Sequence, residues 1–195
     1  TPFTNDELPL TPELFRQVSE KAFPVLDDER GAEMQAEILA AKNALDSVGG
    51  VIECAVLGVP AGVGSPDFGY NVEGVFAQHM FAVPAVKGIA FGAGFGFAGM
   101  KGSEANDPFC VEAGQVRTRT NYNGGVNGGI SNGMPILFEV VIRPTPSIAR
   151  EQDTVDLATM ENAKLCIEGR HDPCIVHRAV PVIEAAAALA ICELL

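Results

Sequence analysis

Residues 46–58 read DSVGGVIECAVLG, and the periodicity of the chain changes within this stretch. From Met34 to Val48, apolar residues recur at steps of three and four, which predicts a helix with one apolar face. From Val51 the apolar residues alternate and both faces carry them, which predicts a strand that is covered on both sides. Gly49-Gly50 separates the two patterns and favours a left-handed stop for the helix.

The same two periodicities predict the remaining elements. Strand alternation returns at residues 136–142, and Pro181 is expected at the first position of the last helix. The other predicted elements are a short helix over 11–22, a helix over 72–82, a glycine-thinned strand within 89–100 and mostly loop over 101–135.

Composition limits what the chain can be. With 195 residues, 47% hydrophobic and 19% charged, it has the composition of one globular domain, and we expect residues 1–195 to form a single one. A formal net charge of -12 argues against a nucleic-acid or anionic-membrane partner. No apolar stretch is long enough to span a membrane, so we expect a cytoplasmic protein. The five scattered cysteines predict reduced thiols and no metal site.

The glycine-rich segment 123–133 is the first candidate site. Paired glycines let backbone N–H groups approach a phosphate or a flavin ring, and after the next strand Arg143, Thr145 and Ser147 add charge and hydroxyl donors. Residues 101–150 are also the only quarter of the chain with a net positive charge, five basic against four acidic groups. The segment matches neither a Walker loop nor a dinucleotide fingerprint. A set of tight turns is the alternative interpretation.

The second candidate is the stretch 169–174, which reads GRHDPC, together with Arg178. Two guanidiniums, an imidazole and a carboxylate within ten residues can form an acid–base and oxyanion cluster. A surface turn with an Arg–Asp ion pair explains the same residues.

Several motifs in this order resemble the chorismate synthase family, from about Ala41 to the end of the chain. They are DSVGG at 46–50, PAVKG at 84–88, GSEAND at 102–107, GGISNG at 128–133, PTPSI at 144–148, TVDL at 154–157 and GRHDPC at 169–174. The resemblance implies an α+β fold of antiparallel sheets packed with helices, as part of that family's β-α-β sandwich. It also implies a homotetramer of full-length subunits.

The resemblance implies a lyase reaction in aromatic amino acid biosynthesis. In that family 5-enolpyruvylshikimate 3-phosphate loses phosphate by a 1,4-anti elimination and becomes chorismate. The cofactor is reduced FMN, which lends an electron transiently although no net redox change occurs. The family is also associated with NADP.

The resemblance also assigns roles to individual residues. Asp172 matches the family's catalytic carboxylate, and Arg170 matches an arginine between flavin and substrate. The remaining matches to FMN contacts are Pro84, Ala85, Gly128, Arg143, Pro144, Thr145, Pro146 and Ser147. Two positions depart from the family pattern, because Arg143 stands where Lys is usual and His177 where Pro is common.

The family's chains are longer, and their amino-terminal portion carries two catalytic histidines and several substrate-binding arginines. Neither histidine motif occurs in this sequence. We therefore expect a carboxy-terminal portion of such a subunit that does not turn over alone. The alternatives are a non-catalytic flavin- or phosphate-binding module and a structural or assembly piece. All site assignments share one hypothesis, that Gly128, the Arg143 cluster and the Arg170/Asp172 turn converge on one anionic cofactor.

Overall fold

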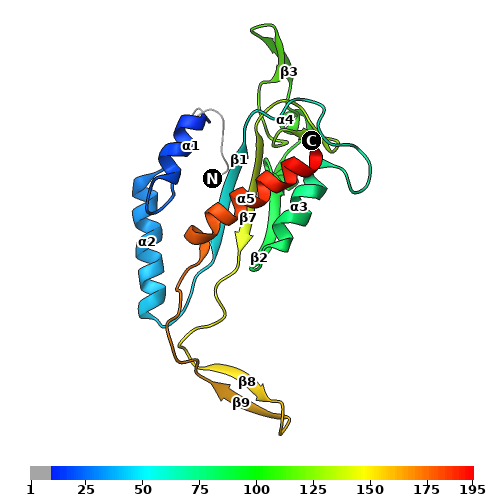
Figure 1. Cartoon of the computed structure of the whole chain (residues 1–195). Helices are drawn as coiled ribbons and strands as arrows, with labels where there is room; N and C mark the ends of the chain where they lie inside the picture. The colour runs from blue at the N-terminus through cyan, green and yellow to red at the C-terminus, as the bar shows by residue number, and fades with distance from the viewer. Residues whose placement is uncertain (1–9) are drawn as a thin grey trace.

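A three-stranded antiparallel sheet forms the centre of the computed structural model, which describes residues 10–195 (Figure 1). The strands lie in the order β1 (Gly50–Val56), β7 (Ile136–Ile142) and β2 (Val86–Phe91). The carboxyl end of β7 is paired with the amino ends of both neighbours, since Ile142 lies opposite Gly50 and Val86. The predicted α+β class and the strand at 136–142 are confirmed.

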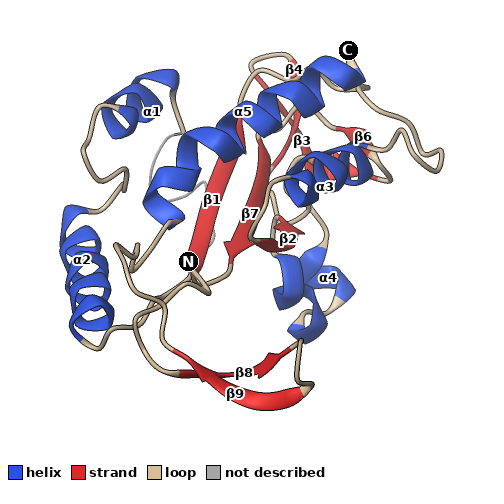
Figure 2. Cartoon of the chain, turned by 60° about the horizontal axis from the view of Figure 1, so that its bottom comes forward, coloured by secondary structure: helices blue, strands red, loops and turns tan. Residues whose placement is uncertain are grey.

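Two helices cover one face of this sheet. Helix α3 (Val72–Ala82) packs against β2 and against α5 (Val176–Leu194), and α5 also packs against β1 (Figure 2). The fully buried ring of Phe76 in α3 lies 5.3 Å from the ring of Phe138 and 6.0 Å from that of Phe91, between centroids. This apolar layer fixes the position of the sheet against the helices.

The opposite face of the sheet differs from the sequence prediction. Val51 and Val141 lie opposite each other there with 52% and 41% of their surface exposed, and Glu53 faces Glu139 two positions further along. This face is covered only in part, since Leu137 is buried there and Ala55 opposite it is half-buried, so the expectation of a strand covered on both faces holds at one end of β1 and not at Val51. An alternating pattern shows on which face the apolar side chains lie, but it does not show whether another element covers that face.

The first two helices lie beside the sheet (Figures 1 and 2). Helix α1 (Pro12–Ser19) is capped by the Thr11 side chain, and α2 (Asp28–Asn43) by that of Asp27. Helix α2 ends about one and a half turns before the predicted Gly49-Gly50 stop, because Leu45 already adopts a left-handed φ of 60°.

Two hairpins project from opposite ends of the molecule (Figure 1). One joins β3 (Phe109–Glu112) to β4 (Gln115–Thr118), and the other joins β8 (Gln152–Asp156) to β9 (Glu161–Leu165). The segment predicted as mostly loop also contains the short elements α4 (Gly102–Ala105), β5 (Val126–Asn127) and β6 (Ile130–Ser131). The predicted strand at 89–100 is shorter than expected, because its glycine-rich part forms the 3-10 helix η1 (Gly94–Gly99).

The last helix starts earlier than predicted. Helix α5 begins at Val176, so Pro181 lies inside it rather than at its first position. The side chain of Val176 packs over Gly50, where an added Cβ would come within 3.3 Å of it. The first turn of α5 makes apolar contacts with the core. The free energy gained by these contacts exceeds the free energy lost because Pro181 has no N–H to donate within the helix.

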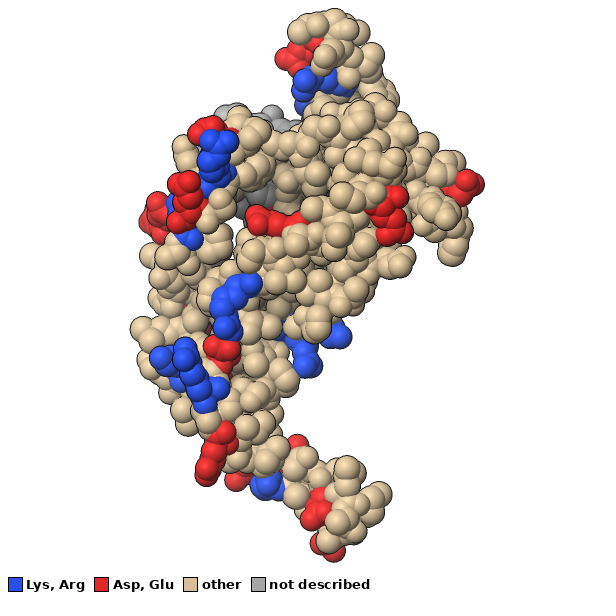
Figure 3. All heavy atoms as spheres, in the orientation of Figure 1, with Lys and Arg blue, Asp and Glu red and all other residues tan. Residues whose placement is uncertain are grey.

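Charged groups are distributed rather than gathered into one basic surface on the face shown in Figure 3, where acidic and basic side chains alternate. Among residues 10–195, no helix combines the length and the apolar character that crossing a bilayer requires.

Candidate functional site

Three loops meet where β7 ends. Because β1 and β2 both run antiparallel to β7, the residues that precede them lie beside the residues that follow Ile142. The loop before β1 is 46–49, the loop before β2 contains Pro84-Ala85, and 143–148 follows β7. The approach is close at Gly49, where an added Cβ would lie 2.4 Å from the carbonyl oxygen of Ile142. Glycine is therefore required at this position.

Hydrogen bonds fix the Arg143–Ser147 run to the other two loops. The backbone N–H of Arg143 donates to the carbonyl oxygen of Ala85 at 3.0 Å. The hydroxyl of Ser47 donates to the carbonyl oxygen of Thr145 at 2.6 Å. The run predicted from the sequence is thus held at its first residue and at its middle residue, and the Arg143 side chain remains exposed.

The GRHDPC turn joins the same cluster. Ser147 Oγ lies 3.0 Å from Nδ1 of His171, and the backbone N–H of Val48 donates to the carbonyl oxygen of Pro173 at 2.8 Å. Two stretches that the sequence presents as separate candidates therefore lie in one cluster.

The carboxylate of Asp172 pairs with the guanidinium of Arg178 at the start of α5. Both side chains are about half exposed, so the ion pair itself adds little stability. Its effect is geometric, because the Arg178 guanidinium holds one carboxylate oxygen in place and makes no hydrogen bond to the other oxygen. Arg170 is exposed and has no ion-pair partner within residues 10–195.

Two further features belong to this cluster, although each also occurs elsewhere among the described residues. The hydroxyl oxygen of Thr145 is buried and has no hydrogen-bond partner among the described residues. Ala85 has a φ of 74°, a left-handed conformation that costs a residue with a Cβ about 1–2 kcal/mol. Unused polar atoms and backbone strain are compatible with a functional site, and the unused Thr145 hydroxyl is the one of the two that could bond a ligand.

Gly128 does not join this cluster in one copy of the chain. It has a φ of 60° in the turn between β5 and β6, beside Gly129, whose carbonyl oxygen accepts from the N–H of Val72 at the start of α3. That end of the sheet is separated from Arg143 by the length of β7, which is about 20 Å. The hypothesis that all three stretches converge is therefore met for two of them and not for Gly128.

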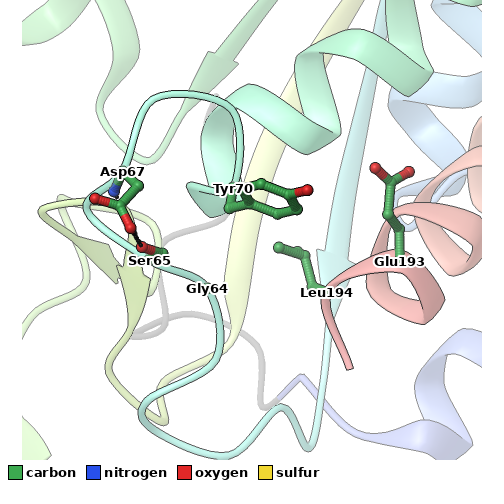
Figure 4. A pocket seen from close by; sticks show the side chains of 6 residues that line it. All are labelled: Gly64, Ser65, Asp67, Tyr70, Glu193 and Leu194. Atoms are coloured by element: carbon green, nitrogen blue, oxygen red, sulfur yellow. Dashed lines mark hydrogen bonds between the residues drawn. The ribbon is translucent and has the colours of Figure 1, made fainter.

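A shallow cavity of about 290 Å³ lies near the Gly128 end (Figure 4). Gly64, which pairs with Ile130, lines it together with Tyr70 and the acidic residues Asp67 and Glu193. No basic side chain lines this cavity among the described residues. Two carboxylates disfavour an anionic ligand, so this cavity does not suit a flavin phosphate.

Sequence reasoning missed two contributors to the site. Ser47 was part of a recognised motif, but only the antiparallel pairing shows that its hydroxyl reaches Thr145. Asp46 forms a 3.3 Å ion pair with Arg150, which follows the 143–148 loop. No spacing in the sequence indicates this ion pair.

Comparison with known proteins agrees with this fold. Residues 10–195 match the family profile described as chorismate synthase, and the chain belongs to that family. A crystal structure of a chorismate synthase superposes with a TM-score of 0.69 at 27% sequence identity, covering 93% of this chain and 47% of the other.

Named relatives give the same family. The chorismate synthase of Dehalococcoides mccartyi is 46% identical over 188 residues, which are 96% of this chain and 51% of the relative. That of Methanocella arvoryzae is 52% identical over 160 residues, 82% of this chain and 43% of the relative. The chain thus spans about half the length of the curated relatives it matches.

Proposed function

We propose that the chain provides the cofactor side of a chorismate synthase active site, in which 5-enolpyruvylshikimate 3-phosphate loses phosphate by a 1,4-anti elimination and becomes chorismate. The reaction class is that of a carbon–oxygen lyase. One observation carries the proposal, namely that the Arg143–Ser147 run, Pro84-Ala85 and the turn at 169–174 meet at one end of the sheet.

The residues of this cluster fit FMN. The phosphate of a flavin mononucleotide needs positive charge and hydroxyl donors, which Arg143 and Ser147 offer, and Thr145 has a hydroxyl with unused bonding capacity. Reduced FMN, when bound, supplies the electron density that the elimination uses without net redox change. The proposed FMN contacts are Pro84, Ala85, Gly128, Arg143, Pro144, Thr145, Pro146, Ser147 and Arg170. Gly128 is included on the family resemblance alone.

Asp172 is the proposed catalytic residue. Arg178 holds one of its oxygens, so the other oxygen is oriented and is able to accept a proton. Arg170 is proposed to bind both the cofactor and the substrate, because its exposed guanidinium suits the phosphate and carboxylates of the substrate.

The rest of the proposal rests on the family resemblance. The 195-residue chain is expected not to turn over by itself, since the family's two histidine motifs do not occur in its sequence. Assembly as a homotetramer of full-length subunits and a cytoplasmic location belong to the same proposal.

Anaerobic assays test the proposal. Appreciable chorismate formed by the 195-residue chain from reduced FMN and substrate would contradict the expected dependence on the missing motifs. In a subunit of the relatives' full length, Asp172→Asn should keep FMN binding and lower turnover by about 10²-fold or more. Asp153→Asn on the exposed β8–β9 hairpin is the matched control and should leave turnover unchanged.

The same variants separate the alternative functions. If the full-length subunit binds FMN and Asp172→Asn leaves its turnover unchanged, a non-catalytic flavin-binding role is favoured for this half. Failure to bind FMN in a fluorescence titration would favour a structural role.

A further inference from the structure

We propose that His171 is a positioning residue that controls the hydroxyl proton of Ser147, and that binding of a flavin phosphate at Ser147 is coupled to the uptake of one proton by His171. The inference rests on the proposed function, because it takes Ser147 as a contact of the FMN phosphate.

The hydrogen bonds of His171 determine its tautomer. Nε2 lies 2.8 Å from the carbonyl oxygen of Ile167, and Nδ1 lies 3.0 Å from Ser147 Oγ. A carbonyl oxygen only accepts, so Nε2 must carry a hydrogen. In the neutral ring Nδ1 then has a lone pair and no hydrogen, and the Ser147 hydroxyl must donate to it.

This arrangement conflicts with a phosphate contact at Ser147. A serine hydroxyl has one hydrogen, and a phosphate oxygen at the site also requires a donor. While His171 is neutral, that hydrogen is committed to Nδ1. Ser147 would then present only lone pairs to the phosphate, which is a repulsive contact.

Addition of one proton to His171 removes the conflict. The proton comes from solvent and binds the lone pair of Nδ1, and no other bond forms or breaks. Nδ1–H then donates to Ser147 Oγ, and the serine hydrogen is free to donate to the phosphate. The phosphate gains a hydrogen bond together with a positive charge behind it, and charge-assisted hydrogen bonds are among the strongest in proteins.

Other charged groups around His171 are mostly compensated. Asp172 pairs with Arg178, and Asp46 pairs with Arg150. Glu168 lies on the exposed turn, where solvent screens it. The remaining charged groups of the surrounding segments are Arg143 and Arg170. An incoming phosphate is therefore the main uncompensated negative charge that a protonated His171 meets.

Calorimetry with FMN and with riboflavin, which lacks the phosphate, tests the coupling. Titrations at about pH 8, where an imidazole is ordinarily neutral, are compared in two buffers of different ionisation enthalpy. We expect FMN binding to be accompanied by measurable net proton uptake and riboflavin binding by none.

His171→Asn separates coupling from simple support. The asparagine amide can still accept from Ser147, but it cannot take up a proton. We expect the preference for FMN over riboflavin to fall about ten-fold or more, proton uptake to disappear and riboflavin affinity to stay unchanged. Ser147→Ala should lower the same preference, and adding His171→Asn to it should change little further.

His79→Asn is the matched control, because His79 bonds Glu193 at 2.7 Å between α3 and α5, outside the site. Its FMN preference and proton uptake should equal those of the unmodified chain.

Each other outcome has a defined consequence. Equal affinity of the unmodified chain for FMN and riboflavin, or no affinity for either, would overturn the proposed phosphate contact and this inference with it. A clear FMN preference without proton uptake, or one retained in His171→Asn, would overturn only the role of His171. The tautomer is checked without flavin by the ¹⁵N shifts of the His171 ring, and a hydrogen on Nδ1 of the free neutral ring would also refute the inference.

Discussion

The hydroxyl of Ser47 donates a 2.6 Å hydrogen bond to the carbonyl oxygen of Thr145, which is 98 positions away in the chain. The next residue, Val48, donates from its backbone N–H to the carbonyl oxygen of Pro173 at 2.8 Å. Two adjacent residues before β1 therefore connect both candidate segments. The loop before β1 acts as the common support of the site.

Ser47→Ala should lower the free energy of unfolding by about 1 kcal/mol, because the carbonyl oxygen of Thr145 loses its hydrogen bond. It should also weaken FMN binding several-fold through the displaced 143–147 run. Urea titration and flavin fluorescence measure the two effects. Ser19→Ala, which removes an exposed hydrogen bond at the end of α1, should change the free energy by less than about 0.5 kcal/mol. Equal effects of the two substitutions would argue against a special role for Ser47.

Asp107 organises the loop that leads to the glycine-rich segment. Its carboxylate, 8% exposed, accepts hydrogen bonds from the Thr120 hydroxyl, from the backbone N–H of Tyr122, and from the backbone N–H and side-chain amide of Asn123. Burial alone would raise the pKa of Asp107, but these four donors stabilise the charged form and hold the pKa below its ordinary value.

Asp107→Asn should lower the free energy of unfolding by about 2 kcal/mol or more near pH 7, since an amide nitrogen cannot accept from these donors. The carboxylate binds protons more weakly in the folded chain than in the unfolded one. Its contribution is therefore complete above about pH 4, the ordinary carboxyl pKa, and is lost as the pH falls towards the lower folded value.

Urea midpoints measured against pH check this prediction. The gap between the unmodified chain and Asp107→Asn should narrow below about pH 4. Asp153→Asn removes an exposed ion pair with Lys164. Its urea midpoint should differ little from that of the unmodified chain at every pH. If the difference in urea midpoint between Asp107→Asn and the unmodified chain does not depend on pH, the charge of the Asp107 carboxylate does not have the assigned role.

The sequence predicts a helix or strand well when that element buries one of its faces. The helix at 72–82 and the strand at 136–142 are predicted at their observed bounds, because each places most of its apolar side chains on the face that it buries. The β8–β9 hairpin was missed because nearly all its side chains are exposed, and such strands carry no alternation of polarity.

The candidate site was predictable in parts but not as a whole. Family motifs indicated Arg143, Ser147 and Asp172 individually. Their convergence depends on the antiparallel pairing of β1 and β2 with β7, which links residues far apart in the sequence. The same pairing separates Gly128 from the others, since it lies beyond the opposite end of β7.

Ala85 carries backbone strain at the site, with a φ of 74°. Ala85→Gly should raise the free energy of unfolding by about 1 kcal/mol, because glycine adopts this conformation without steric cost. Ala36→Gly, at an exposed position inside α2, should lower it by about the same amount. Thermal or urea unfolding of both variants measures the contrast. Equal destabilisation by both substitutions would show that the left-handed conformation at Ala85 carries no strain, because both variants then lose only the backbone entropy of glycine.

The five thiols should differ sharply in reactivity. Burial, with the carboxylates of Glu184 and Glu53 nearby, raises the pKa of the Cys54 thiol to about 12. Since only the thiolate reacts, alkylation of Cys54 at about pH 8 should be about a thousand-fold slower than that of an ordinary thiol. Cys166 and Cys192 are exposed and should react first.

Alkylation followed by mass spectrometry of the peptides measures these rates. In urea sufficient to unfold the chain, Cys54 should react as fast as Cys192, because the desolvation that raises its pKa is lost on unfolding. Equal rates in the folded chain would mean that β1 and α5 separate readily and expose Cys54 to solvent. That result would contradict the packing of α5 on the sheet, which also fixes Arg178 against Asp172.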